Sequence, residues 1–254
     1  MNQVPFRSLD ELPELDEWET RVNLAACYRI FAHFGMNDLL YTHVSARVPG
    51  MHNQFFMNPW ELHFSEITAS SLIKIDVEGK IVEPTSYAVN EEGFSIHSAI
   101  HRAREDAACV CHTHTPAGIA VSKLNEGLLP LNQTSLEFHN RVAYHDYEGI
   151  TLQLDERERL VADLGGHRAM ILRNHGLLTA GRTIAEAFYL MYNLDRACHL
   201  QLKTTGQVAK VFFVGHELAE YRANQYKRND RPRGTLEWPA LLRILDRKDP
   251  SYKD

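Results

Sequence analysis

Cys109-Val110-Cys111-His112-Thr113-His114 is the stretch from which we predict both the fold and the site of this chain. The apolar run leading into it, residues 107–111, is too brief for a helix and is typical of a buried strand. Alternate side chains of a strand share a face, so His112 and His114 should project together, where two imidazoles can chelate one ion. Cys109 and Cys111 fall on the opposite face, and we expect them to be packing residues.

A third imidazole is available in Leu172-Arg173-Asn174-His175-Gly176, where a second predicted strand, residues 169–172, runs into a turn. Three neutral imidazoles with an open fourth position are the pattern of catalytic zinc. The residues alone leave an alternative, in which His112 and His114 are hydrogen-bonded core histidines and His175 is a turn residue, because a bare H-x-H pattern is more often structural.

A rival pair of histidines, His97 and His101, is one helical turn apart and therefore also shares a face. No acidic third ligand is near them in the sequence, so we interpret them as helix-face histidines around a site rather than as a second metal site.

Helical patterns surround these strands. Apolar residues at helical spacing predict a helix from residue 18 to 34 that stops at Gly35. Asn90 is the expected N-cap of a helix through about residue 104, and Thr183 with Glu186 forms a capping box that opens a helix to about residue 203.

Composition limits the class of protein. With 254 residues, 44% hydrophobic and 24% charged, the chain can bury one large core. A net charge of -6 with mixed signs argues against a nucleic-acid partner, and no stretch approaches the roughly 20 apolar residues of a membrane span. Four cysteines without a secretion signal suit a reducing compartment, so we expect a cytoplasmic protein.

The predicted organisation has three parts. Residues 1–16 form a polar arm, residues 17–221 form one α/β domain, and residues 222–254 form a tail that packs on this domain or on a neighbouring subunit. The tail carries Trp238, Leu241 and Leu242, which are too apolar for a free linker.

Several motifs together resemble the class II aldolase/adducin family: Phe94-x-Ile96-His97-x-Ala99-Ile100, Arg104-x-Asp106-Ala107, Val110-x-His112-x-His114 and Asn174-His175-Gly176. The resemblance runs from about Glu19 to Gly206. It implies a three-layer α/β/α fold around a mostly antiparallel sheet and a homo-oligomer, commonly a tetramer. It also implies a divalent metal on the three histidines, with zinc favoured and Mn, Fe or Co as alternatives.

The chain departs from the enzymes of this family at informative positions. The carboxylate expected nineteen residues before the first metal histidine is Gly93 here, and the adjacent Glu92 is rotated by about 100° on a helix. The phosphate-binding loops also differ, with bulky residues in Thr42-His43-Val44-Ser45 and in Asn58-Pro59-Trp60-Glu61, and with Tyr87-Ala88-Val89 offering no counterpart of a Ser-Ser pair. In these features the chain is closer to the adducin head domain than to the sugar-phosphate aldolases.

Two functions remain open at this point. The first is a metal-dependent lyase, decarboxylase or isomerase that acts on a small oxo or hydroxy compound through a metal-stabilised enediolate, with Glu92 or Tyr144 moving a proton. The second is a non-catalytic binding or assembly module with a retained metal site. An open three-histidine site is more typical of chemistry than of structural zinc, which favours the enzyme. Because Gly93 stands where the aldolases carry their carboxylate, we predict that the protein is not an efficient aldolase for sugar phosphates.

Overall fold

A seven-stranded sheet lies at the centre of the computed structural model, which describes residues 14–149, 154–206, 211–226 and 233–254. The strand order within these residues is β3-β2-β1-β4-β7-β6-β5. The strands are β1 (His43–Arg47), β2 (Gln54–Met57), β3 (Ile73–Asp76), β4 (Cys109–Thr113), β5 (Val142–His145), β6 (Ala169–Leu172) and β7 (Gly176–Gly181).

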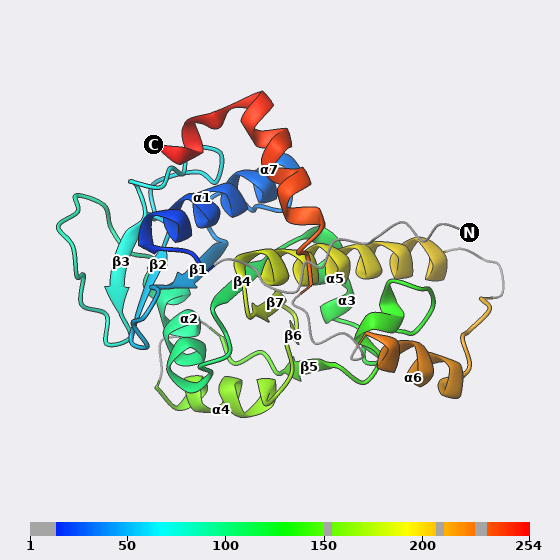
Figure 1. Cartoon of the computed structure of the whole chain (residues 1–254). Helices are drawn as coiled ribbons and strands as arrows, with labels where there is room; N and C mark the ends of the chain where they lie inside the picture. Colours follow the sequence, from blue (N-terminus) through cyan, green and yellow to red (C-terminus); the bar gives the residue numbers. More distant parts are fainter. Residues whose placement is uncertain (1–13, 150–153, 207–210, 227–232) are drawn as a thin grey trace.

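The sheet is mostly antiparallel. Every neighbouring pair is antiparallel except β5 and β6, which are parallel. Helices cover both faces, so the α/β class and the three-layer arrangement predicted from the sequence are confirmed (Figure 1).

Two separate apolar layers hold the helices on the sheet. On one face, the core cluster joins α1 (Glu17–His33) and α5 (Ile184–Thr205) to side chains such as Val44 and Cys111. On the other face, α2 (Glu91–Ala103) and α4 (Leu154–Leu164) pack on Val110 and Leu178. The remaining helical segments are α3 (Pro116–Ser122), η1 (Ser135–Phe138), α6 (His216–Gln225), α7 (Glu237–Lys248) and η2 (Pro250–Lys253).

The helix starts follow the local sequence, with one correction. Asn90 caps α2 by accepting from the Gly93 amide, as predicted. Thr183 caps α5 by accepting from the Glu186 amide, but the reciprocal half of the predicted capping box is wrong. The Glu186 carboxylate accepts from the backbone and side chain of Arg182 instead, because the guanidinium gives it a charged partner.

Strand β4 begins and ends two residues later than the predicted run of residues 107–111. His112 therefore lies inside the strand and His114 one residue beyond it. Cys109 and Cys111 face the core under α1 and α5, on the side opposite to His112, as the alternation predicts. All four cysteines are buried and free.

The C-terminal residues pack on the same chain. Trp238 of α7 is 8% exposed and its ring lies 6.0 Å from that of Phe188 on α5, while Leu241 and Leu242 are partly buried against the same core. Most of the predicted N-terminal arm, residues 1–13, lies outside the described residues, and the three-part division stays a prediction.

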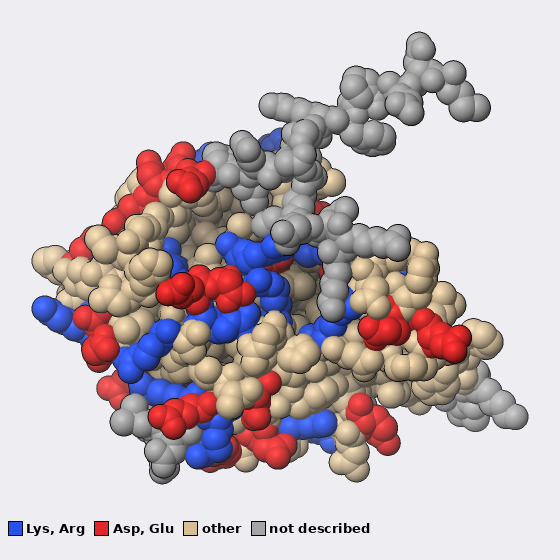
Figure 2. Space-filling model, turned by 60° about the horizontal axis from the view of Figure 1, so that its bottom comes forward, with Lys and Arg blue, Asp and Glu red and all other residues tan. Residues whose placement is uncertain are grey.

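No helix among the described residues has the length and apolar character that crossing a membrane requires. On the face drawn in Figure 2, lysine and arginine side chains alternate with aspartate and glutamate side chains rather than forming one broad basic surface.

Candidate metal centre

The three histidines of the sequence prediction meet at one end of the central strands. His112 comes from β4, His114 follows the end of that strand, and His175 sits in the tight turn between β6 and β7. The turn reverses through Asn174, whose φ of 57° is left-handed, and closes with a bond from the His175 amide to the Leu172 carbonyl at 3.1 Å. A turn this tight places the imidazole of His175 over the end of β4.

Glycine at position 176 is what allows the turn to approach β4. A Cβ on Gly176 would lie 2.4 Å from the backbone oxygen of Thr113, a contact that no side chain can make. The close approach of the two backbones is therefore tied to the residue that follows His175.

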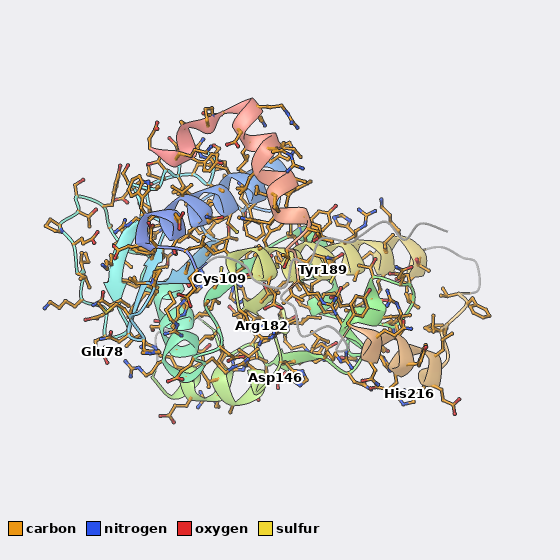
Figure 3. All side chains as sticks on the ribbon, viewed as in Figure 1. Glu78, Cys109, Asp146, Arg182, Tyr189 and His216 are labelled. Atoms are coloured by element: carbon orange, nitrogen blue, oxygen red, sulfur yellow. The ribbon has the colours of Figure 1, made fainter. Side chains whose placement is uncertain are left out.

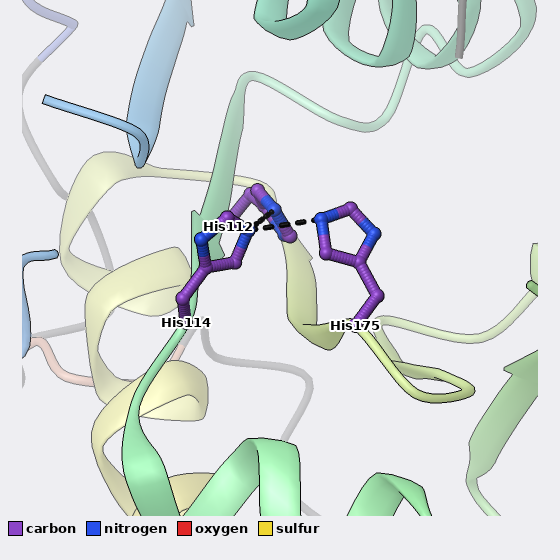
Figure 4. Close-up of side chains that lie close together, drawn as sticks. All are labelled: His112, His114 and His175. Atoms are coloured by element: carbon purple, nitrogen blue, oxygen red, sulfur yellow. Dashed lines mark hydrogen bonds between the residues drawn. The ribbon is translucent and has the colours of Figure 1, made fainter. Parts of the chain in front are cut away.

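The ring nitrogens converge on one point (Figure 4). The Nε2 atom of His112 lies 2.8 Å from that of His114, and the Nε2 atom of His114 lies 2.9 Å from that of His175. One ligand atom from each residue falls within 4.8 Å of the other two. The structure thus brings together all three residues that the sequence predicts as ligands.

The partner of Nδ1 in His112 and in His114 determines which nitrogen of each ring carries the proton. Nδ1 of His112 faces the Leu177 carbonyl at 3.0 Å, and Nδ1 of His114 faces the Asp38 carboxylate at 3.4 Å. Both partners are acceptors, so each Nδ1 carries the proton and each Nε2 is a bare lone pair. Two lone pairs 2.8 Å apart repel each other unless a cation lies between them. The donor set therefore fits a divalent transition metal, which imidazole Nε2 atoms bind at about 2.0 to 2.1 Å.

Burial also keeps these imidazoles neutral. It lowers the pKa of His112 well below the ordinary value, with His175 and His114 adding to the effect. Burial, followed by the neighbouring His114, lowers the pKa of His175 to about 4. Burial also lowers the pKa of His114. Neutral imidazole is the form that binds a metal, so near pH 7 no proton must be displaced from these nitrogens.

The centre is closed on one side and open on the other. His112 is 1% exposed, whereas the His114 side chain is 17% exposed and His175 is half-buried. Tyr147 lies on the open side, with its ring 6.4 Å from that of His175. A small molecule can therefore approach from the side of His114 and His175.

Of the two predicted proton-transfer residues, Glu92 lies closer to this centre. It is exposed in the first turn of α2, near enough to His114 for its charge to act on that imidazole. Tyr144 packs on the α5 side of the sheet, its hydroxyl accepts a bond from the Leu128 amide at 3.0 Å, and burial raises its pKa. A raised pKa opposes loss of the phenolic proton. Both roles stay predictions.

The rival pair His97 and His101 belongs to a different arrangement. Ser45 lies between them, with its Oγ 2.5 Å from Nδ1 of His97 and 2.7 Å from Nε2 of His101, and His97 continues to His43 at 2.7 Å. The pair forms part of a buried hydrogen-bonded chain that leads toward His112, which is consistent with the interpretation that it surrounds a site.

Sequence reasoning missed Asp38 and His43 as neighbours of the centre. Asp38 has no signal in the sequence, because it reaches His114 across a distance of 76 residues. His43 had one: it alternates with Ser45 on a strand, so both face the same helix. The signal is too weak to use without knowing that β1 lies beside β4.

Most of this chain matches one known protein family. Residues 22–202 match the model of the Class II Aldolase and Adducin N-terminal domain. Rat alpha-adducin is 39% identical over 245 residues, which is 89% of this chain and 33% of the relative.

Two solved structures resemble the whole chain. An aldolase II superfamily protein from Pseudomonas syringae is 48% identical with a TM-score of 0.90, covering 95% of this chain and 98% of that one. The L-fuculose 1-phosphate aldolase from Glaciozyma antarctica PI12 is 28% identical with a TM-score of 0.84, covering 96% and 97%.

Proposed function

The chain belongs to the class II aldolase and adducin family, and from this premise we propose that it is a metal-dependent enzyme acting on a small oxo or hydroxy compound. The reaction class is that of a lyase, with decarboxylation or isomerisation as the related alternatives. Zinc is the proposed metal, and Mn, Fe or Co would suit the same donor set less well.

One observation carries the proposal: the bare Nε2 atoms of His112 and His114 face each other at 2.8 Å while their Nδ1 protons are held elsewhere. His175 completes three ligands, and the half-buried side leaves room for substrate. When bound, the metal would polarise substrate oxygens and stabilise negative charge on them. The chain's part is to hold the neutral imidazoles in place, His112 through the Leu177 carbonyl and His114 through the Asp38 carboxylate.

We do not expect efficient cleavage of sugar phosphates, although one structural relative is a fuculose 1-phosphate aldolase. Position 93 has no carboxylate, and general acid-base catalysis by such a group typically contributes about 10² to 10⁴-fold. A retro-aldol assay on ketose 1-phosphates should stay well below about 10⁴ M⁻¹s⁻¹ in kcat/KM. A value at or above that level would contradict this expectation, and Glu92→Gln would then be the first variant to test.

A second candidate function has support from the alpha-adducin relative, which covers 89% of this chain. In that case the domain would be a binding or assembly module and its metal a structural element. A three-ligand centre with an open side favours chemistry, because structural zinc usually has four protein ligands.

The test of the enzyme proposal combines metal analysis with small-molecule binding. Purified protein should contain one metal per chain, and ligand-observed NMR against oxo acids, hydroxy acids and unphosphorylated sugars should give hits that disappear in His175→Ala. Protein that holds no metal after supplementation with zinc would reject the enzyme and favour the module.

Assembly and location also remain proposals. We propose a homo-oligomer, with a tetramer as the expected form, on the basis of the family. The apolar tail does not by itself require a partner, because Trp238 is buried within its own chain. Light scattering that reports a monomer at micromolar concentration would reject the oligomer. We expect the protein in the cytoplasm, which fractionation of cells would test.

A further inference from the structure

His43 and Gly93 share one space. A Cβ built on Gly93 would lie 2.6 Å from Cδ2 and 3.0 Å from Nε2 of His43, which is closer than real side chains approach. Residue 93 must therefore be glycine as long as the His43 ring keeps this position. The two departures from the enzyme pattern, an altered loop at residues 42–45 and a missing carboxylate at position 93, are thus one structural exchange.

The His43 ring borders the metal centre. Strand β1 lies beside β4, and the register places His43 directly opposite His112. The two ring centroids are 4.9 Å apart with 34° between the ring planes. Burial and His97 lower the pKa of His43 most, and His114 and His175 are near enough to lower it further. The imidazole that replaces the side chain of residue 93 is therefore adjacent to the ligands.

A buried chain of hydrogen bonds lies behind His43. Its Nδ1 is 2.7 Å from Nε2 of His97, whose own Nδ1 is 2.5 Å from the Ser45 hydroxyl oxygen. That hydroxyl is 2.7 Å from Nε2 of His101. All four side chains are almost entirely excluded from solvent. Among the described residues, the ring of His43 is hydrogen-bonded on its Nδ1 side alone.

His101 lies at the far end of this series of hydrogen bonds, and its protonation determines which nitrogen carries the proton in His97 and in His43. Burial lowers the pKa of His101 to about 3 and lowers those of His43 and His97 well below the ordinary value, so each ring is neutral with one N–H. Nδ1 of His101 is buried without a hydrogen bond of ordinary geometry among the described residues, but the Ala107 carbonyl is close enough to favour a proton there.

The other protons then follow one by one. Because Nδ1 of His101 carries its proton, its Nε2 accepts from the Ser45 hydroxyl. Ser45 in turn accepts from Nδ1 of His97, and His97 accepts at Nε2 from Nδ1 of His43. His43 is left with a bare lone pair on Nε2, an atom that makes no hydrogen bond to any residue in the described part of the chain.

We propose that the Nε2 lone pair of His43 accepts a hydrogen bond from a hydroxyl group of the substrate, in the place of a carboxylate at position 93. His97, Ser45 and His101 are positioning residues that hold the ring in this tautomer. The inference rests on the proposed function and narrows it, because an acceptor at this place selects a substrate that carries a hydroxyl group.

The tautomer can be observed directly by imidazole ¹⁵N NMR of the full chain, metal-free and zinc-loaded. His43 should be protonated at Nδ1 and bare at Nε2 in both states. Ser45→Ala should mix the two tautomers of His43 without loss of zinc. The control Ser98→Ala removes a buried hydroxyl of α2 whose only hydrogen bond among the described residues is to the Ser95 carbonyl, and should change nothing. A proton on Nε2 of His43, or coordination of zinc by His43, would overturn the proposal.

A double-mutant cycle measured by thermal unfolding can test whether His43 occupies the space of a side chain at position 93. Gly93→Ala should lower Tm by about 5 °C in the wild-type background, because the methyl group overlaps the His43 ring. In a His43→Ala background the same change should cost nothing. Gly166→Ala, at a site with no atom within 4 Å of the new methyl group, is the control. An equal loss in both backgrounds would show that His43 does not occupy the space of residue 93.

The substrate role can be tested with two small acids, glycolate and acetate, which differ in one hydroxyl group. Titration calorimetry on zinc-loaded protein should show that His43→Ala weakens glycolate binding about tenfold and leaves acetate binding unchanged, since one hydrogen bond is lost. Equal losses for both acids would overturn the acceptor role. Binding of neither acid by the wild type would overturn the proposed function, and with it the role of His43, whereas the NMR and thermal results would stand.

Discussion

Buried polar groups lie at both ends of the central strands, and the two groups differ in whether they have hydrogen-bond partners. At one end, the lone pairs of His112 and His114 face each other with no proton between them. At the other end, where β7 finishes and β6 starts, Glu186 is 2% exposed. Its carboxylate accepts from the Arg182 amide at 2.7 Å, from the Arg182 guanidinium at 3.1 Å and from the Arg233 amide at 3.2 Å.

The two ends do not differ in the size of their hollows, because a cavity of about 530 Å³ lies beside Tyr147 and Asn174, next to His175. A cavity of about 540 Å³ opens at the end that holds Glu186, lined by Glu137, Glu186, Arg168, Arg182 and Arg233 among others. Figure 3 labels Arg182, which precedes α5, and Tyr189, which belongs to α5. The Glu186 carboxylate is paired with Arg182, and Glu137 lies 3.7 Å from Arg233, so both groups have a cationic partner within the chain. The comparison teaches that unmet lone pairs, rather than cavity size, distinguish the candidate site.

The largest expected effect is at the histidine end. His112→Ala should weaken zinc binding by at least about 100-fold, because it removes a ligand whose position is held by β4. Zinc content after dialysis against a competing chelator measures this. His167→Ala, at the arginine end, is the matched control and should keep one zinc per chain. Equal zinc content in both variants would contradict the assignment of the centre.

The next effect should appear at the arginine end. Glu186→Ala removes the carboxylate that accepts from the part-buried amides of Arg182 and Arg233, and should cost about 3 kcal/mol of unfolding free energy in urea, because each buried donor left without an acceptor costs about 1 to 3 kcal/mol. Zinc binding should be unchanged, because the cluster lies at the opposite end of the strands. A loss of stability below about 0.5 kcal/mol would place Glu186 among ordinary surface charges and blur the comparison.

The pH dependence of stability should come from Glu137. Burial raises its pKa to about 7 in the folded chain, against the attraction of Arg233, while the unfolded value stays near 4.5. The folded state therefore binds more protons between these values, and stability should fall as pH rises from 5 to 8, by about 2 kcal/mol from this one group. Glu137→Gln should remove that part of the slope. An unchanged slope would show that the carboxyl is already ionised in the folded state at low pH.

The smallest expected effect is also at the histidine end, where it tests whether Asp38 orients His114. Asp38→Asn should weaken zinc binding by about tenfold, at the low end for a group that orients a ligand, because the contact to His114 is 3.4 Å long and the carboxylate is 44% exposed. Competition with a chromogenic chelator resolves a change of this size. Asp76→Asn, on β3, is a control outside the centre. No difference between the two variants would mean that the Leu177 carbonyl and packing orient the ligands without Asp38.

Features that depend on near neighbours along the chain could be predicted from the sequence. Strand alternation separates His112 from Cys109 and Cys111, and the caps at Asn90 and Thr183 follow from side chains that reach an amide three residues ahead. The resemblance to a family added the fold, and it strengthened the prediction from the residues that His112, His114 and His175 bind a metal.

Only the tertiary structure decided which partner each polar group meets. The Glu186 carboxylate accepts from Arg182, and the Tyr144 hydroxyl accepts from the Leu128 amide. The His43 ring occupies the space that a side chain at position 93 would need. A local pattern states what a side chain can donate or accept. The partner that satisfies it is chosen by strand order and helix placement, which bring together residues tens of positions apart, and by the free energy of leaving a buried polar group unmatched.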